Sequence, residues 1–350
     1  MSDDGTTASP DPGRQQAVEA VPQPPSSGGA AYRLNQQGLA FENQGRLREA
    51  EESYRQASEM FRPLIRHDGH CLEMPHLAFA LSRLGGVYRQ LGQYEQSEAC
   101  HREAVALYRQ LVEREGRTHL ARYLVQAFNS HAHSLRKLRR DAEAEECRGE
   151  HVALCRKLLD GNAERAGDLA AALGLHGSVL EKLDRLAKAE QCYRESVAMC
   201  RMLAAEWDPR STAVGHLASA LDNHARLLRR LGRLLEAEQC QRERVEIERE
   251  LVGPREMPWR AEDLAFALRE RGWLLKLLGR LAEANECLGE AVGIHRTVAE
   301  QRPEDAILLA YALREHGDVL QAAGHLLAAE QCHDESASIL KQAGAQAPGP

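Results

Sequence analysis

The sequence predicts an all-α protein, an α-solenoid built from seven similar helix hairpins. Three observations lead to this fold class. A 24-residue segment, clearest as Leu217–Cys240, recurs with its apolar positions in phase, and a glycine recurs inside it. Successive copies start 47, 47, 45, 48, 47 and 45 residues apart, near residues 30, 77, 124, 169, 217, 264 and 309. Regular periods of this size are typical of solenoids, in which each repeat packs only on its neighbours.

The first part of each copy predicts an amphipathic helix. We number the positions of a copy as columns, starting from its first residue. Columns 5 and 12 are apolar in all seven copies and, with columns 1 and 8 or 9, mark one face of a helix. Column 9 is never larger than alanine, which would let a second backbone come close. Column 16 should end the helix in a left-handed residue, because it is glycine in five copies: Gly45, Gly92, Gly232, Gly279 and Gly324.

A second helix is predicted to open on column 21, which is small in every copy, and its apolar row continues to column 31. Neither helix can bury its apolar stripe alone, so neighbouring hairpins must stack. The third copy departs from the pattern, with Arg139 and Asp141 where glycine and an apolar residue are expected.

The two ends of the chain differ from the array between them. Residues 1–29 are rich in Pro, Gly, Ser and Asp and predict a disordered tail, and residues 341–350 predict a second one. The solenoid is expected over 30–340. Residues 1–29 do not resemble a signal peptide, and no apolar run is long enough to span a membrane, so we expect a cytoplasmic protein without a membrane partner.

These columns resemble the tetratricopeptide repeat, a family with small residues at columns 9, 21 and 28, a large apolar one at column 12 and glycine at column 16. The long period is similar to that of kinesin-light-chain arrays and of arrays attached to bacterial signalling ATPases. The resemblance implies a right-handed superhelix whose first helices line a concave groove. His151 and Arg244 are too large for the family pattern at column 28.

Cysteine and histidine each recur in one column. Six cysteines share column 24, which we interpret as a small, soft core position and not as a disulfide or zinc site, and free thiols imply a reducing compartment. Four histidines share column 8: His131, His176, His224 and His316. No carboxylate recurs beside them in the sequence, so we interpret them as partly buried packing residues, with a pH-sensitive role as the alternative.

No motif for catalysis or for a cofactor was found. The chain lacks the phosphate-binding loop, the HExxH and GxSxG motifs and an EF-hand loop. We therefore expect a protein that is not an enzyme and that needs neither a cofactor nor a metal.

The predicted binding site follows from the resemblance, which places columns 3, 6, 10, 13 and 14 in the groove. These columns hold ten basic and four acidic residues, a charge of +6 in a chain of −7. The basic candidates are Arg89, Arg136, Lys137, Lys182, Arg226, Arg229, Arg230, Arg269, Lys276 and Arg314. The aromatic candidates are Tyr32, Phe79, Phe266, Trp273 and Tyr311. Arginine beside aromatic rings is typical of binding surfaces. Basic residues near a helix C-terminus, which simply suit the helix dipole, are the alternative explanation.

Three functions remain open. The favoured one is a non-catalytic scaffold or adaptor that binds an acidic peptide or protein segment in the basic groove. A structural or regulatory subunit that self-associates through its uncapped C-terminal hairpin is the alternative. Nucleic-acid binding on the same face is disfavoured by the net negative charge and by the lack of a dense basic stripe.

Overall fold

The computed structural model describes residues 28–68, 72–159, 165–206, 212–252 and 258–346. Within these ranges all regular structure is helical, which confirms the predicted class. Most of the predicted tails, 1–27 and 347–350, lie outside them. Fourteen α-helices follow one another: α1 (Gly29–Asn43), α2 (Leu47–Asp68), α3 (Met74–Gln90), α4 (Tyr94–Arg109), α5 (Ala121–Lys137), α6 (Asp141–Leu159), α7 (Ala166–Lys182), α8 (Leu186–Glu206), α9 (Thr212–Arg230), α10 (Leu234–Val252), α11 (Pro258–Leu277), α12 (Leu281–Gln301), α13 (Ala306–Ala322) and α14 (Leu326–Gln346).

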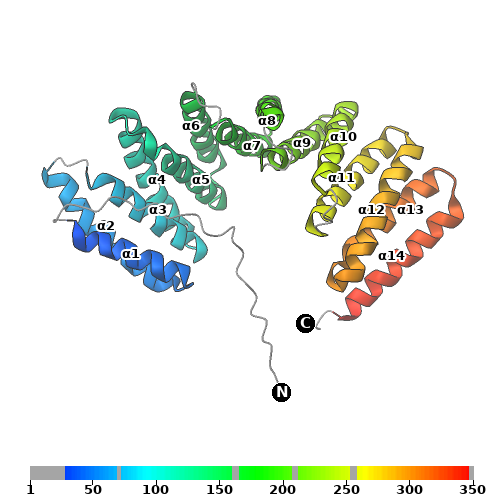
Figure 1. The fold of residues 1–350 in the computed structure, drawn as a ribbon, viewed down its shortest axis with the longest axis horizontal. Coiled ribbons are helices and arrows are strands. Elements are labelled where there is room, and N and C mark those ends of the chain that lie inside the picture. The colour runs from blue at the N-terminus through cyan, green and yellow to red at the C-terminus, as the bar shows by residue number, and fades with distance from the viewer. Residues whose placement is uncertain (1–27, 69–71, 160–164, 207–211, 253–257, 347–350) are drawn as a thin grey trace, which may run out of the picture. The chain divides into compact units, whose positions relative to one another are not determined.

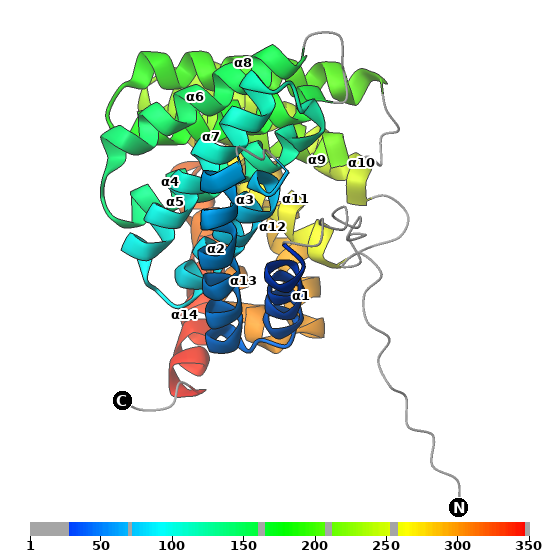
Figure 2. The ribbon, with the colours of Figure 1, turned by 90° about the vertical axis from the view of Figure 1, so that its left-hand side faces the viewer.

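The helices form two compact units, an N-terminal unit up to Leu138 with α1–α5 and a C-terminal unit from Arg139 with α6–α14. The division falls in the turn of the third copy, where the sequence departs from the pattern. Within each unit, successive helices pack on one another in chain order, as α11 to α14 do in Figure 1 and α1 and α2 in Figure 2. This stacking confirms the solenoid. The handedness of a superhelix through all seven copies stays a prediction.

At least six of the seven hairpin turns share one backbone motif. In each, the amide of column 17 donates to the carbonyl of column 12, as from Arg233 to Leu228 at 2.9 Å, while column 16 has a positive φ. This is the Schellman motif, which satisfies carbonyls at a helix C-terminus. The second helix begins at column 18, three residues earlier than predicted. The reason is that the amide of column 21, for example Ala237, already donates to the carbonyl of column 17, so column 21 makes a helical hydrogen bond.

Two copies hold a side chain in the left-handed region, Arg139 at φ 60° and Asp184 at φ 57°. Such a conformation costs a non-glycine residue about 1–2 kcal/mol. We expect Arg139→Gly to raise the free energy of unfolding by about 0.5–1 kcal/mol, after the extra chain entropy of glycine is subtracted. The reciprocal change, Gly232→Arg at the same column, should lower it by about 1 kcal/mol. Urea titrations of both variants test this, and an unchanged midpoint for Gly232→Arg would contradict it.

Column 9 is small because a large side chain of column 25 lies against it. A Cβ on Gly177 would come within 2.8 Å of the Tyr193 ring, and one on Gly38 within 2.7 Å of the Tyr54 ring. The close approach was predicted correctly, but its partner is mainly a side chain and not a backbone. Where column 9 is alanine, as at Ala225 in the C-terminal unit, column 25 holds the flexible Gln241.

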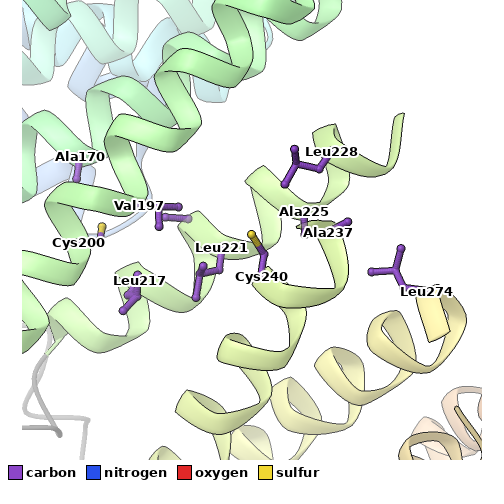
Figure 3. Close-up of a cluster of buried hydrophobic side chains, with 11 residues drawn as sticks. Ala170, Val197, Cys200, Leu217, Leu221, Ala225, Leu228, Ala237, Cys240 and Leu274 are labelled. Atoms are coloured by element: carbon purple, nitrogen blue, oxygen red, sulfur yellow. The ribbon is translucent and has the colours of Figure 1, made fainter. Parts of the chain in front are cut away.

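The core lies between successive hairpins and includes the cysteines. Figure 3 shows Cys200 and Cys240 among buried alanine, valine and leucine side chains of the C-terminal unit. None of the eight cysteines of the described ranges forms a disulfide, and burial raises the pKa of the Cys200 and Cys240 thiols to about 11. The interpretation of cysteine as a core residue is confirmed, and Cys71 lies outside the described residues.

An arginine–glutamate ladder joins neighbouring second helices. Arginine of column 33 forms two hydrogen bonds to glutamate of column 27 in the next copy, at 2.6 and 2.7 Å for Arg62 and Glu103. The same arrangement joins Arg156 to Glu195, Arg201 to Glu243, Arg249 to Glu290 and Arg296 to Glu335. Exposed pairs contribute little each, about 0–1 kcal/mol, but paired forks fix geometry. The ladder therefore links successive hairpins in the same register in which their cores pack.

The last helix is longer than predicted. Helix α14 ends at Gln346, so residues 341–346, expected to be disordered, are helical. Alanine and glutamine are good helix formers, and they outweigh Gly344 in this stretch. No helix among the described residues combines the length and apolarity needed to cross a lipid bilayer.

Candidate binding site

The N-terminal unit has a groove of about 760 Å³ between its first helices. Of its lining residues, five lie on α1, six on α3 and five on α5, while Tyr108 comes from α4. We call this cavity the N-terminal groove. The expectation that first helices line a hollow surface therefore holds within this unit.

The charged lining of the N-terminal groove consists of three arginines and one carboxylate: Arg83, Arg89, Arg122 and Glu42. Glu42 lies 2.6 Å from Arg83 Nη2 and also accepts a hydrogen bond from the Tyr54 hydroxyl at 3.1 Å. Burial raises the pKa of Tyr54, so this phenol stays protonated and holds Glu42 in place. Arg89 is exposed and makes no ion pair with another described residue. The groove thus keeps a net positive charge.

Aromatic and amide side chains complete the lining. Phe79 lies on α3, and Tyr123 on α5 carries the Arg122 guanidinium 4.8 Å above its ring. Gln36, Asn43, Gln90 and Gln126 add side chains that donate and accept hydrogen bonds. The composition suits the peptide bonds and apolar side chains of an extended chain.

The structure brings two of the five N-terminal candidates into the groove. Phe79 and Arg89 line it. Tyr32 instead packs edge-on against the His76 ring, with centroids 5.6 Å apart, and Lys137 lies 5.9 Å from the Tyr94 ring. Arg136 is half-buried and is not among the lining residues.

Three predicted aromatic residues are exposed in the C-terminal unit, and each has an arginine over its ring. Phe266 and Trp273 of α11 and Tyr311 of α13 are 44%, 38% and 39% exposed. Arg244 lies 5.2 Å from the Phe266 centroid, Arg229 4.8 Å from that of Trp273 and Arg314 5.3 Å from that of Tyr311. Guanidinium groups are attracted to aromatic faces, so these contacts hold the rings in place.

Most basic candidates of the C-terminal unit form ion pairs within the protein. Arg229 pairs with Glu270 at 3.1 Å, Arg269 with Glu315 at 2.7 Å, Lys276 with Asp318 at 3.7 Å and Arg230 with Asp184 at 2.7 Å. Each pair joins two different hairpins. Asp184 lies in the turn between α7 and α8, and its partner Arg230 lies on α9. The other three candidates, Lys182, Arg226 and Arg314, are exposed; Arg226 donates to Asn223 at 2.8 Å and lies 3.9 Å from the Asp222 carboxylate. Four of the seven basic candidates of this unit are therefore engaged by carboxylates of the protein itself.

The sequence analysis omitted column 7. Arg83 of this column lines the N-terminal groove, and Glu270 and Glu315 form the ion pairs just described. Columns 3, 7, 10 and 14 lie at i, i+4, i+7 and i+11, which is one face of a helix, so the spacing could have identified it. Including column 7 lowers the charge of the predicted set from +6 to +5. Arg122 and Tyr123 were missed because they precede the first column of their copy.

The histidine column does have carboxylates beside it, which corrects the sequence interpretation. His131 Nε2 lies 3.1 Å from Glu98, a residue of column 22 in the preceding copy. Glu145 and Glu190 of the same column partly offset the effect of burial, which lowers the pKa of His176 and of His224. In the sixth copy Asn285 replaces the glutamate of column 22 and lies 2.8 Å from His316 of the seventh copy. The four rings are half-buried, as predicted.

The cysteine and histidine columns meet. Cys192, Cys240 and Cys332 lie 3.9, 3.8 and 4.0 Å from Nδ1 of His176, His224 and His316. Burial raises the pKa of all three thiols and lowers that of the three rings, which favours neutral pairs over a reactive thiolate. No three His, Cys, Asp or Glu side chains in the described ranges are placed to hold a metal ion.

The stacked hairpins, the left-handed turns and the lined groove define a helical-repeat protein whose N-terminal unit has a groove between its first helices. Comparison with known proteins identifies the repeat. Residues 78–119 and 217–255 match one model of the tetratricopeptide repeat, and residues 31–62 and 170–201 match another. These four segments are tetratricopeptide repeats, the family that the sequence analysis expected.

Solved structures with similar folds include a signal-transduction ATPase from Pyrococcus horikoshii with a tetratricopeptide-repeat sensor. It is 13% identical, with 89% of this chain and 43% of that chain covered and a TM-score of 0.61. The apo form of RapI is 14% identical over 90% of this chain and 98% of its own, with a TM-score of 0.52. A putative kinesin light chain from Podospora anserina with TPR-like repeats is 16% identical over 65% and 98%, with a TM-score of 0.48. No curated protein matches the sequence.

Proposed function

We propose that this protein is a non-catalytic scaffold that binds an acidic segment of another protein in the N-terminal groove. The observation that carries this proposal is the charge of the lining, in which Arg83, Arg89 and Arg122 face a single carboxylate that Arg83 already pairs. A partner carboxylate beside Arg89 would find a cation whose charge is available. The presence of tetratricopeptide repeats in a sequence without a catalytic motif supports a role as a protein-interaction scaffold, without indicating which partner it binds.

Charge alone is too weak to hold a partner. One exposed ion pair contributes about 0–1 kcal/mol, while micromolar affinity requires about 8 kcal/mol. The remaining free energy has to come from the aromatic rings of Phe79 and Tyr123 and from hydrogen bonds to the amide side chains. The expected ligand is therefore an extended segment that alternates acidic and apolar side chains.

We expect Arg89→Glu to weaken binding of such a segment about tenfold or more at low salt, because it replaces attraction by repulsion. Peptides are first selected on the whole protein from a displayed library of random sequences, and affinities are then measured by fluorescence anisotropy. Arg48→Glu is the matched control, since Arg48 is exposed on a second helix and an acidic residue suits its first turn. If both variants bind the selected peptides equally, the groove is not the binding site.

Self-association through the last hairpin stays the second candidate. One observation favours it: Leu326 and Leu327 at the start of α14 are 66% and 71% exposed, whereas Leu47, Leu186 and Leu234 at the same column as Leu326 pack against the core. Light scattering over a concentration series distinguishes a monomer from an assembly. Binding to nucleic acid is not expected, and cytoplasmic location stays a prediction.

A further inference from the structure

The C-terminal unit carries a second surface with different chemistry. Besides Phe266, Trp273 and Tyr311, Leu277 and Ile307 are 49% and 39% exposed on the same two helices. We call these five residues the aromatic surface. Single exposed apolar side chains are ordinary, but several large ones gathered on neighbouring helices mark an interaction site.

The five residues form two stripes. On α11, Phe266, Trp273 and Leu277 are spaced i, i+7 and i+11, and on α13 Ile307 and Tyr311 are spaced i and i+4. Both spacings keep the side chains on one helix face. Two ion pairs, Arg269 with Glu315 and Lys276 with Asp318, tie α11 to α13. The stripes are therefore held side by side before any partner arrives, which lowers the entropy cost of binding.

The surroundings of the aromatic surface are positively charged. Arg314 lies over the Tyr311 ring and makes no ion pair with another described residue. Arg226 on α9 is exposed, with its nearest carboxylate, that of Asp222, 3.9 Å away. The acidic Glu270, Glu315 and Asp318 are all engaged by Arg229, Arg269 and Lys276. An apolar centre with exposed arginines at its rim is complementary to an apolar ligand with acidic flanks.

We infer that the aromatic surface binds an amphipathic helix of a partner protein, with an apolar face toward α11 and α13 and carboxylates toward Arg226 and Arg314. The length of the α11 stripe favours a helix. From Phe266 to Leu277 the stripe spans 11 residues, about 16 Å at 1.5 Å per residue, or three turns of a partner helix. Helices in such sites anchor through apolar side chains at i, i+4 and i+7.

This inference is independent of the proposed function, because the aromatic surface lies in the other unit and selects an apolar helix. The two sites would let one chain hold two different segments. If the experiments show that one of the two sites does not bind, the proposal for the other site is unaffected.

The test uses the whole protein and a displayed library of helix-forming peptides in which the surface positions are randomised. The variants Trp273→Ser and Tyr311→Ala introduce residues that the chain already carries at the same columns on α7, where Ser178 and Ala171 lie. Both side chains are exposed, so their replacement should leave the fold unchanged. Leu235→Ser is the matched control, because Leu235 is 63% exposed on the second helix α10.

The expected result is a set of peptides with apolar residues at i, i+4 and i+7 and with aspartate or glutamate beside them. Circular dichroism should show that they gain helix on binding. Trp273→Ser with Tyr311→Ala should weaken binding about tenfold or more, while Leu235→Ser and Arg89→Glu leave it unchanged. The inference is overturned if no peptide is enriched, if the enriched peptides bind without helix, or if the aromatic variants bind as tightly as Leu235→Ser.

Discussion

Acidification to about pH 5 is expected to destabilise both units, because each buries neutral histidine. Burial is the main cause that lowers the pKa of His101 to about 3 and those of His151 and His295 to about 4. Arg89, His131 and His133 lower the pKa of His101 further, Arg148 that of His151, and Arg269 that of His295, where Glu315 opposes it. In the unfolded chain the value is about 6.5.

A folded-state pKa below the unfolded one means that the folded chain binds fewer protons. The stabilisation is complete above about pH 6.5 and is lost as the pH falls toward the folded-state values. At pH 5 the loss is about 2 kcal/mol for each of these histidines, since one pKa unit corresponds to about 1.4 kcal/mol. His101 affects the N-terminal unit, whereas His151 and His295 both affect the C-terminal unit. The C-terminal unit should therefore lose more of its stability on acidification than the N-terminal unit.

Urea titrations at neutral and acidic pH measure this loss. His295→Leu removes one titrating group, and leucine is suitable because Leu340 occupies the same column in the seventh copy. Between neutral pH and pH 5, the free energy of unfolding of this variant should fall by about 2 kcal/mol less than that of the original protein. His216→Gln, at an exposed site of α9, is the control. Equal pH dependence in the original protein and in His295→Leu would show that His295 is not responsible.

Arg244→Ala is expected to lower the free energy of unfolding of the C-terminal unit by about 2–3 kcal/mol. Arg244 is 8% exposed and donates to Asp222 Oδ1 at 2.6 Å, and its guanidinium also lies against the Phe266 ring. Removal leaves Asp222 without its main cation. The loss should stay below that of a fully buried pair, because Asp222 is partly exposed and still accepts from Gln241 at 3.0 Å.

A double variant separates the ion pair from packing. Asp222→Ser with Arg244→Ala reproduces the combination that the second copy has in the same columns, Ser82 and Ala104. We expect this variant to recover about 1–2 kcal/mol relative to Arg244→Ala alone, because no carboxylate is left unpaired. A coupling energy near zero in the double-mutant cycle would mean that Arg244 contributes through packing alone.

The fold was predictable from the sequence because the signals for the helices and for the turn lie within the sequence of each hairpin. Apolar spacing gives the helices, and glycine at column 16 gives the turn. The turn is robust, since Asp184 adopts the left-handed conformation where glycine is missing. The start of the second helix was misplaced because the small residue of column 21 was taken as its first position, although the apolar residue of column 18, present in six of the seven copies, lies nearly one turn before it and already belongs to the helix.

The binding site was predictable only in part. The position of Phe79 and Arg89 followed from the resemblance, but the ion pairs did not. Arg269 and Glu315 are 46 residues apart, and their contact depends on how two first helices lie against each other. Counting the charged residues of each column treats Arg269 and Glu315 as two separate charges that are open to a ligand. The glutamates of column 22 were missed for the same reason, because each belongs to the hairpin before its histidine.

The arginine–glutamate ladder has a consequence for how such an array can change. Every inner hairpin carries the arginine of column 33, which pairs with the next hairpin, and the glutamate of column 27, which pairs with the preceding one. Insertion or loss of one whole repeat would therefore still place an arginine opposite a glutamate at the new junction. The outermost copies break this rule, because column 27 is Gln56 in the first and column 33 is Lys341 in the seventh. A head-to-tail contact between two chains would bring an amide to an ammonium group. The ladder is therefore compatible with the addition of whole repeats by gene duplication, but it does not stabilise head-to-tail association of separate chains.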